Sequence, residues 1–255
     1  MTTTTISKSA LVTGANKGIG REIVRRLAAT GFKVWLGARD AERGLAAARA
    51  LQAESLDVHW IELDVTNDGS VAAAAKAVAA ADPALDVLVN NAGIATNYVE
   101  ALAPDGTYDV PPSQECVADI QATYDVNVFG PIRVTQAFLP LLLAAPAARI
   151  VMMSSYQASI GRALDVSAAG YSTNIMGYAS SKTALNAITV AFAKELAPKG
   201  VKVNAAAPGY TATDLNGHRG RRTVQQAAEI AVRLATLDAD GPTAGYFDDD
   251  GSLPW

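Results

Sequence analysis

The sequence predicts an α/β fold, with helices covering both faces of a doubly wound parallel β-sheet of about seven strands. Short apolar, β-branched runs alternate with longer alanine-rich runs of helical period, as in successive βαβ units. Most of the short runs are continuously apolar, which indicates burial on both faces of the sheet. A glycine-rich turn also joins the first strand to the first helix. Together these features predict three layers, α/β/α.

The expected elements follow one another at regular intervals. Strands are predicted at 10–13, 33–38, 57–63, 87–90, 149–153, 201–206 and 246–247. Helices are predicted at 19–30, 43–53, 70–80, 115–143, 178–196 and 223–234. Two stretches, 96–113 and 161–177, break the series, and we expect both to be surface loops. No linker or repeat divides the chain, so we expect one domain over residues 1–255.

The composition favours a small-molecule partner. The 255 residues are 50% hydrophobic and 18% charged, enough apolar material for one large core. The net charge of −4, with both signs interspersed, argues against nucleic acid and anionic membrane as partners. Residues 1–9 are polar, and no later apolar stretch is expected to approach the roughly 18 residues of a membrane span. Cys116 is the only cysteine, so we expect a cytoplasmic protein without internal disulfides.

No metal site is expected. His59 and His218 lack the further His, Cys or spaced carboxylate ligands that a metal centre needs. The acidic run 248–250 lacks the spaced ligand set of a calcium loop, and we interpret it as a solvated acidic turn.

The turn after the first strand reads TGANKGIG over residues 13–20 and has the pattern of a phosphate-binding loop. Gly14 permits a tight turn, Gly18 lets the backbone approach a pyrophosphate, and Gly20 allows close packing of helix and strand. The following helix N-terminus offers free N–H groups to the phosphates. A plain glycine-rich βα turn is the alternative, but the strand before and the helix after favour a dinucleotide site.

The end of the second strand favours NADP(H) over NAD(H). Ala38 stands where an NAD-binding fold usually has an acid for the ribose hydroxyls. Arg39 follows it, and Lys17 lies in the glycine turn, so two cations could pair with a 2′-phosphate. Asp40 could instead neutralise Arg39 or hold the ribose, and both cations could be ordinary surface charges.

Tyr178 and Lys182 form a Y-x-x-x-K pair one turn apart at the start of a predicted helix. A free phenol has a pKa of about 10, and a nearby ammonium can lower it. We therefore interpret Tyr178 as a general acid for an alkoxide that forms as hydride arrives. The spacing alone is weak evidence, because such pairs occur on helices by chance.

Other polar residues fall where a catalytic site would need them. Ser154 and Ser155 end the fifth predicted strand, at the carboxyl edge of the sheet, although such a pair also serves as an ordinary turn or cap. The segment 90–93, NNAG, closes the fourth strand and could tie neighbouring turns together or line the cofactor groove. Asn127 lies in a predicted helix; it would need polar partners if buried, and faces solvent otherwise.

In this order, the motifs resemble the classical short-chain dehydrogenase/reductase family, and the chain end resembles its carbonyl-reductase-like members. The resemblance rests on 13–20, Asp64-Val65, 90–93, Asn127, Ser154-Ser155, 178–182, Pro208-Gly209 and 241–247. It implies a Rossmann-like fold and hydride transfer between NADP(H) and a carbonyl/alcohol pair. It also implies a catalytic tetrad, in which Ser155 orients the carbonyl, Tyr178 transfers the proton, Lys182 holds the nicotinamide ribose, and Asn127 supports a water relay.

The resemblance implies a larger set of cofactor contacts as well. These residues are Gly14, Asn16, Lys17, Gly18, Ile19, Gly20, Arg39, Asp64, Val65, Asn90, Ala92, Gly93, Tyr178, Lys182, Pro208, Gly209, Thr211 and Thr213. The rival interpretation is a sensor of the same fold that binds NADP(H) without chemistry, and the presence of Ser155, Tyr178 and Lys182 argues against it.

Two segments set this chain apart from shorter family members. A longer insert, about 156–177, separates Ser155 from Tyr178 and is expected to lie over or beside the active site. A short lid is expected at about 210–222, with Gly217 and Gly220 as candidate hinges. Because of the insert, the oligomeric state stays undecided between a homo-oligomer (dimer or tetramer) and a monomer.

Overall fold

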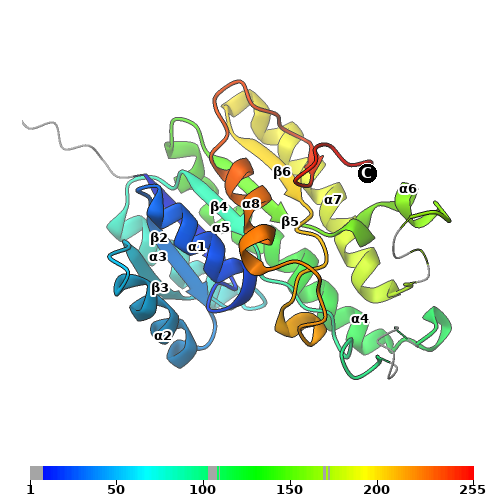
Figure 1. Cartoon of the computed structure of the whole chain (residues 1–255). Coiled ribbons are helices and arrows are strands. Elements are labelled where there is room, and N and C mark those ends of the chain that lie inside the picture. The colour runs from blue at the N-terminus through cyan, green and yellow to red at the C-terminus, as the bar shows by residue number, and fades with distance from the viewer. Residues whose placement is uncertain (1–7, 103–107, 109, 169–170, 172) are drawn as a thin grey trace, which may run out of the picture.

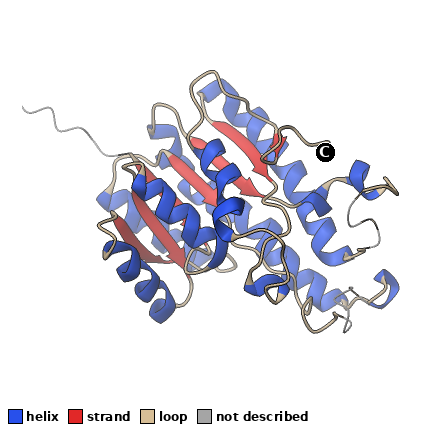
Figure 2. Cartoon of the chain, viewed as in Figure 1, coloured by secondary structure: helices blue, strands red, loops and turns tan. Residues whose placement is uncertain are grey.

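The computed structural model describes residues 8–102, 108, 110–168, 171 and 173–255; the expectations for 1–7 and for part of the insert (169, 170 and 172) lie outside them. Its centre is a seven-stranded sheet of order β3-β2-β1-β4-β5-β6-β7 (Figure 2), and each neighbouring pair is parallel. This confirms the predicted fold class. The strands are β1 (Ser9–Thr13), β2 (Lys33–Ala38), β3 (Val58–Glu62), β4 (Val87–Asn90), β5 (Arg149–Met153), β6 (Lys202–Ala206) and β7 (Tyr246–Phe247).

The order of strands changes direction at β1. Leu11 pairs with Trp35 of β2 on one side and with Leu88 of β4 on the other. The chain therefore builds β2 and β3 on one side of β1 before it crosses to build the rest of the sheet. Such a switch point leaves a crevice at the carboxyl ends of the strands, where open α/β sheets bind their ligands.

Helices cover both faces of the sheet (Figure 1). The apolar residues of α1 (Gly18–Ala29), α2 (Ala41–Gln52) and α8 (Val224–Ala235) share one buried cluster with Ala10 and Val12. Those of α3 (Asp68–Ala81), α5 (Gly130–Ala144) and α7 (Met176–Leu196) share a second cluster with Leu11. Because successive side chains of a strand point to opposite faces, the continuously apolar β1 contributes to both cores.

The predicted helix 115–143 corresponds to one continuous helical run. The spacing of its backbone hydrogen bonds changes from α-helical to π-helical and back within the run. The run consists of α4 (Val117–Tyr124), a π-helical turn η2 (Asp125–Phe129) and α5. This run, Val117–Ala144, is long and apolar enough to span a membrane by length and composition, so the expectation that no stretch approaches a span was wrong. Phe138 and Leu142 of the run are fully buried in the second core cluster, as in a core helix.

The insert is more helical than the sequence predicts. It contains η3 (Tyr156–Ala158) and α6 (Ile160–Ala163), and α7 begins at Met176 rather than at Tyr178. Ser159 caps α6, because its hydroxyl accepts a hydrogen bond from the backbone N–H of Arg162 at 3.2 Å. The remaining short 3₁₀ segments are η1 (Pro112–Gln114), η4 (Ala197–Lys199) and η5 (Asp214–Asn216).

Candidate active site

A cavity of about 660 Å³ lies at the carboxyl ends of the strands near the switch point. Its walls come from the glycine turn, the end of β2, the turns after β3 and β4, and the predicted lid. Many of the predicted cofactor residues line it: Gly14, Asn16, Lys17, Gly18, Ile19, Gly20, Arg39, Asp64, Val65, Ala92, Gly93 and Thr213. The volume lies within the range of small-molecule and cofactor sites.

The glycine turn is shaped to approach a ligand closely. Gly14 and Gly18 have φ of +62° and +57°, a region that side chains rarely adopt. A Cβ at Gly14 would lie 2.8 Å from Cα of Ala92, whereas a Cβ at Gly18 would meet nothing closer than a Thr213 methyl at 3.7 Å. Among the described residues, no side chain caps the first N–H groups of α1. Those groups are available to phosphate oxygens, which is the geometry of a dinucleotide-binding helix start.

The two asparagines of the NNAG segment have different roles. Asn91 holds the glycine turn, because its backbone N–H donates to Thr13 Oγ1 at 3.0 Å and its side-chain amide donates to the carbonyl of Thr13 at 2.8 Å. Asn90 points into the interior instead, where its amide donates to Thr135 Oγ1 at 3.1 Å. Of the two roles predicted for this segment, Asn91 fulfils the first, because it ties neighbouring turns together, whereas the cofactor contact predicted for Asn90 stays a prediction.

The charges at the end of β2 favour an anionic ligand. Asp40 caps α2 by accepting from the backbone N–H of Arg43 at 2.9 Å, and its other oxygen pairs with the Arg43 guanidinium at 2.9 Å. Asp40 is therefore paired with Arg43 rather than with Arg39. The alternative that Asp40 holds a ribose stays a prediction, because Asp40 also lines the cavity. Arg39 is exposed and has no salt bridge or hydrogen bond to any other described residue.

Lys17 is paired across the mouth of the cavity. Its ammonium lies 2.5 Å from one carboxylate oxygen of Asp214, in the lid, and His218 contacts the other oxygen at 2.8 Å. The side chains of Lys17 and Asp214 are 56% and 53% exposed, so the bridge is open to solvent. A phosphate that approaches Lys17 must compete with Asp214.

Asp64 is held in its ionised form beside the cavity. Its carboxylate accepts hydrogen bonds from the backbone N–H and the hydroxyl of Thr66, at 3.0 and 2.7 Å. Burial alone would raise the pKa of Asp64, but these hydrogen bonds and the charges of Arg39 and Arg133 leave it below its usual value.

Tyr178, Ser155 and Lys182 lie together at the start of α7. Ser155 follows β5, and its hydroxyl lies close enough to the Tyr178 phenol to affect the pKa of that phenol. Lys182 is 4% exposed; its ammonium donates to the carbonyl of Met153 at 2.8 Å and lies 5.8 Å from the centre of the Tyr178 ring. These three side chains bring a hydroxyl donor, a phenol and a cation to one place at the edge of the sheet.

The pKa shifts at this cluster differ from the sequence-based expectation. Burial raises the pKa of Tyr178 above its ordinary value, and the nearby Ser155 hydroxyl opposes this rise. The net rise is opposite to the lowering expected from a nearby ammonium, and the Lys182 ammonium donates its hydrogen bond to the Met153 carbonyl. Burial also lowers the pKa of Lys182 itself to about 8.

Asn127 is fully buried in the π-helical turn and has polar partners. Its carbonyl oxygen accepts from the backbone N–H of Ile94 at 2.9 Å. Its amide donates to the carbonyl of Ile94 at 2.8 Å and to Ser181 Oγ at 3.0 Å. It therefore ties the turn after β4 to α7, and solvent exposure, one of its two interpretations, is excluded. A π-helical turn is common at functional sites.

Glu115 is a site residue that sequence reasoning did not identify. Its carboxylate accepts hydrogen bonds from the backbone N–H groups of Met176 and Gly177, at 2.6 and 2.8 Å, immediately before Tyr178. A Cβ at Gly177 would come within 3.1 Å of that carboxylate, so a glycine suits this contact. The cap comes from a residue 61 positions away, and no local pattern could indicate it.

Six predicted cofactor residues lie outside the wall of the 660 Å³ cavity: Asn90, Tyr178, Lys182, Pro208, Gly209 and Thr211. Thr211 anchors the turn after β6, because its hydroxyl bonds the carbonyls of Pro208 and Gly209 at 3.4 and 3.2 Å. Gly209 has φ of +75°, and the Arg222 side chain packs directly against it.

The two ends of the predicted lid, 210–222, are joined to each other by backbone contacts. Thr211 bridges Arg222, and the backbone N–H of Ala212 donates to the Arg222 carbonyl at 2.9 Å. Gly220 was a candidate hinge, but a Cβ there would lie 2.0 Å from the Thr211 carbonyl carbon, so close packing explains this glycine.

A second cavity, of about 200 Å³, adjoins Tyr178 between α4 and the segment after β4. Nearby, Tyr98 is 7% exposed and lies close to Tyr210 of the lid. Burial, together with the neighbouring Tyr210 side chain, raises the pKa of Tyr98 to about 12. Aromatic side chains from two segments thus meet beside Tyr178.

The acidic run 248–250 is not a fully solvated turn, which corrects the sequence interpretation. Asp248 is only 7% exposed, and its carboxylate accepts a hydrogen bond from the Tyr156 hydroxyl at 2.8 Å. The error arose because the partners of Asp248 lie far away in the sequence. Within the described part of the chain, no group of three or more His, Cys, Asp or Glu residues is arranged to hold a metal ion.

Comparisons with known proteins agree with this geometry. The family model for short chain dehydrogenase matches residues 8–223. The chain is 33% identical to (-)-isopiperitenone reductase of Mentha piperita, over 97% of this chain and 98% of that protein. It is 32% identical to (+)-neomenthol dehydrogenase of Arabidopsis thaliana, over 93% and 94%.

Solved structures show the same likeness. An NADPH-bound carbonyl reductase from chicken fatty liver superposes with a TM-score of 0.82 at 28% identity, covering 98% of this chain and 99% of that one. Salutaridine reductase from Papaver somniferum gives 0.80 at 27% identity, covering 95% and 99%. The extent of the family match, together with the fold, shows that the chain belongs to the short-chain dehydrogenase family of oxidoreductases.

Proposed function

We propose that the protein is an NADP(H)-dependent oxidoreductase that interconverts a carbonyl compound and its alcohol, with Tyr178 as proton donor and acceptor. The observation that carries this proposal is the placement of the Ser155 hydroxyl, the Tyr178 phenol and the buried ammonium of Lys182 at one edge of the sheet, with the ammonium 5.8 Å from the centre of the Tyr178 ring. The cluster supplies two hydroxyls for one substrate oxygen and a cation that favours a phenolate.

The residues of the large cavity fit a dinucleotide with a 2′-phosphate. The uncapped start of α1 offers N–H groups to the pyrophosphate, and exposed Arg39 offers a cation at the end of β2. The cavity also has the Asp64 and Val65 wall that the family resemblance assigns to the adenine. The NADPH-bound carbonyl reductase supports the same choice of cofactor. When bound here, NADPH would supply the hydride.

The chemistry of the chain itself is a proton transfer. Ser155 donates a hydrogen bond to the substrate oxygen, and Tyr178 gives its phenolic proton to that oxygen as it gains negative charge. The ammonium of Lys182 stabilises the resulting phenolate through space. In the oxidative direction, the Tyr178 phenolate accepts the proton from the alcohol. Asn127 holds the catalytic helix and the turn after β4 in register throughout.

The names of the relatives suggest candidate substrates. We propose that the substrate is a carbonyl compound, or the matching alcohol, that fits beside Tyr98 and Tyr210. The compounds in those names are the first to test: isopiperitenone, salutaridine and the alcohol neomenthol.

The test is oxidation of NADPH and of NADH across a panel of ketones and aldehydes that includes isopiperitenone and salutaridine, with neomenthol as an alcohol for the reverse reaction. We expect turnover of at least one compound and a preference for NADPH. Tight NADPH binding without turnover of any compound would contradict the enzyme proposal and support the sensor. A preference for NADH would contradict the roles given to Arg39 and Lys17.

A further inference from the structure

We propose that the C-terminal end of the chain positions the catalytic serine. Three residues, Tyr246, Asp248 and Asp249, form what we call the C-terminal brace, and they hold the turns that follow β5 and β6. The brace lies beyond residues 8–223, the part matched by the family model. The inference rests on the proposed function, because it is there that Ser155 acquires its role.

Tyr246 is the part of the brace that contacts the catalytic serine. It lies in β7, is 1% exposed and pairs with Ala205 of β6. Its hydroxyl donates to the backbone carbonyl of Ser155. Burial raises the pKa of Tyr246, so the hydroxyl stays protonated and remains a donor.

The neighbouring serine is held by a second hydrogen bond, from the side of α7. The hydroxyl of Ser154 donates to Asn186 Oδ1 of α7 at 2.7 Å. The serine pair is therefore fixed between β7 on one side and α7 on the other. Because α7 also carries Tyr178, these contacts set the position of the Ser155 turn relative to the phenol.

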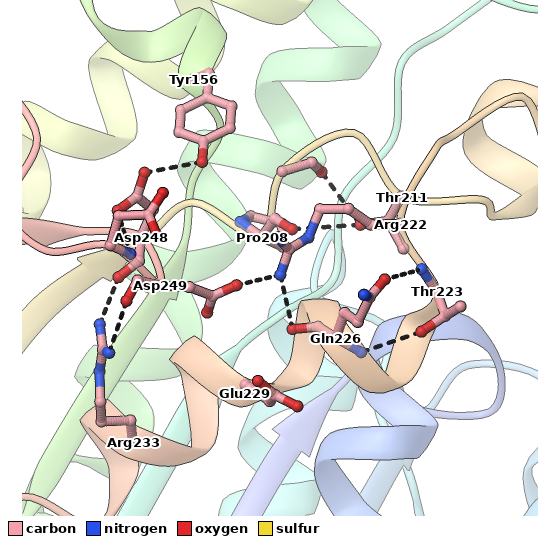
Figure 3. Close-up of polar contacts among 12 residues, drawn as sticks. Tyr156, Pro208, Thr211, Arg222, Thr223, Gln226, Glu229, Arg233, Asp248 and Asp249 are labelled. Atoms are coloured by element: carbon pink, nitrogen blue, oxygen red, sulfur yellow. Dashed lines mark hydrogen bonds and ion pairs between the residues drawn. The ribbon is translucent and has the colours of Figure 1, made fainter.

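Asp248 holds the residue that follows Ser155. One of its oxygens accepts from the Tyr156 hydroxyl at 2.8 Å (Figure 3). The other oxygen accepts from the backbone N–H groups of Asp250 and Gly251 at 2.9 and 3.0 Å. Burial, together with this carboxylate, raises the pKa of Tyr156 to about 12. The Tyr156 ring also has a cation–π contact with Arg162 of the insert, whose guanidinium lies 4.9 Å from the ring centre.

Asp249 connects the brace to the turn after β6. Its carboxylate pairs with Arg222, whose guanidinium also donates to the carbonyl of Gln226 at 3.0 Å (Figure 3). The stem of Arg222 packs on Gly209: a Cβ at that glycine would lie 2.5 Å from Arg222 Cδ. Arg233 of α8 holds the acidic turn by donating to the Asp249 carbonyl at 3.1 Å.

These contacts predict separate effects for the two arms of the brace. Loss of the Tyr246 hydroxyl frees the Ser155 carbonyl and should disturb the alignment of Ser155 with the substrate oxygen, which acts on kcat. Loss of the Asp249 charge loosens Arg222 over the Pro208-Gly209 turn, which the family resemblance places at the nicotinamide, and should act on NADPH affinity.

The experiment compares Tyr246→Phe with wild type and with Thr189→Val. The control loses a buried hydroxyl hydrogen bond of the same kind, Thr189 Oγ1 to the Leu185 carbonyl at 2.8 Å, about two turns beyond Lys182 on α7. For each variant we measure kcat for carbonyl reduction, NADPH affinity by fluorescence titration, and the unfolding midpoint. We expect Tyr246→Phe to lower kcat about tenfold with NADPH affinity within about twofold of wild type, and Thr189→Val to keep wild-type kcat.

Wild-type kcat in Tyr246→Phe would overturn the inference, and so would an equal loss of kcat in Thr189→Val. Should Tyr246→Phe not fold, two variants at half-buried residues test the remaining contacts of the brace. Tyr156→Phe removes the hydrogen bond to Asp248, and Asp249→Asn weakens the ion pair with Arg222. We then expect a several-fold lower kcat for the first and a several-fold weaker NADPH affinity for the second; wild-type values for both would overturn the inference. Absence of turnover in wild type would instead refute the proposed function, and the brace with it.

Discussion

Lys182 donates its hydrogen bond to the carbonyl of Met153, at 2.8 Å, while its ammonium lies 5.8 Å from the centre of the Tyr178 ring. The cation is thus held by the end of β5 and acts on the phenol through space. This placement fixes the ammonium independently of the substrate, but it takes a charge out of water. Burial accordingly lowers the pKa of Lys182 to about 8.

The buried charge predicts a pH-dependent stability for Lys182→Met. Between about pH 8 and the ordinary lysine value of 10.5, the unfolded chain holds more protons than the folded chain. The free energy of unfolding of wild type therefore rises with pH in that window. We expect Lys182→Met to be more stable than wild type by about 2 kcal/mol at pH 7, with the difference shrinking as the pH approaches 10.5.

Urea unfolding of both proteins from pH 7 to 10.5 measures this. Lys76→Met, which removes an exposed lysine of α3, is the control and should show no such trend. A Lys182→Met variant that is less stable than wild type at pH 7 would contradict a desolvated ammonium.

Asp214 is expected to weaken NADPH binding, because its carboxylate already pairs with the Lys17 ammonium at 2.5 Å. Asp214→Asn removes the competing charge and should strengthen NADPH binding about threefold, leaving NADH unchanged, since an exposed ion pair is worth less than about 1 kcal/mol. Fluorescence titration with each cofactor measures the effect. The control is Glu229→Gln on α8, which breaks an exposed ion pair between Glu229 and Arg26 of α1. Equal gains for both cofactors would show that Asp214 does not act through the 2′-phosphate.

The Glu115 cap is expected to support both stability and catalysis. Glu115→Ala removes two hydrogen bonds at the start of α7, just before Tyr178, and should lower the free energy of unfolding by about 1 kcal/mol. We expect kcat to fall several-fold, with partial recovery in Glu115→Gln, which keeps an acceptor oxygen.

The matched control is Asn67→Ala, which removes the cap of α3, where Asn67 Oδ1 accepts from Ser70 N at 2.9 Å. It should lose similar stability without loss of kcat. If both variants lose kcat equally, the effect of Glu115 is one of general stability.

The strands and the glycine turn could be predicted because their signals are local. Leu11 and Val12 are both buried because the sheet is covered on both faces, and this is visible as a continuous apolar run. Gly14 and Gly18 mark backbone conformations that other residues rarely adopt.

The contacts that complete the site could not be predicted in this way. Glu115 reaches α7, Asp248 reaches Tyr156, and Tyr246 reaches Ser155 across long stretches of sequence. Each looks ordinary in its own neighbourhood, and only the sheet order brings the partners together. The π-helical turn around Asn127 lies within one continuous helical pattern, so its change of hydrogen bonding leaves no sign in the periodicity.

The most direct test of the central claim is Tyr178→Phe, assayed in parallel for NADPH binding and for reduction of the best carbonyl substrate of wild type. The substitution removes only the phenolic hydroxyl that lies beside Ser155. We expect NADPH affinity within about twofold of wild type and kcat lower by about a thousandfold, in the range of a lost general acid. A Tyr178→Phe enzyme that keeps wild-type kcat would contradict the assignment of Tyr178 as the proton donor.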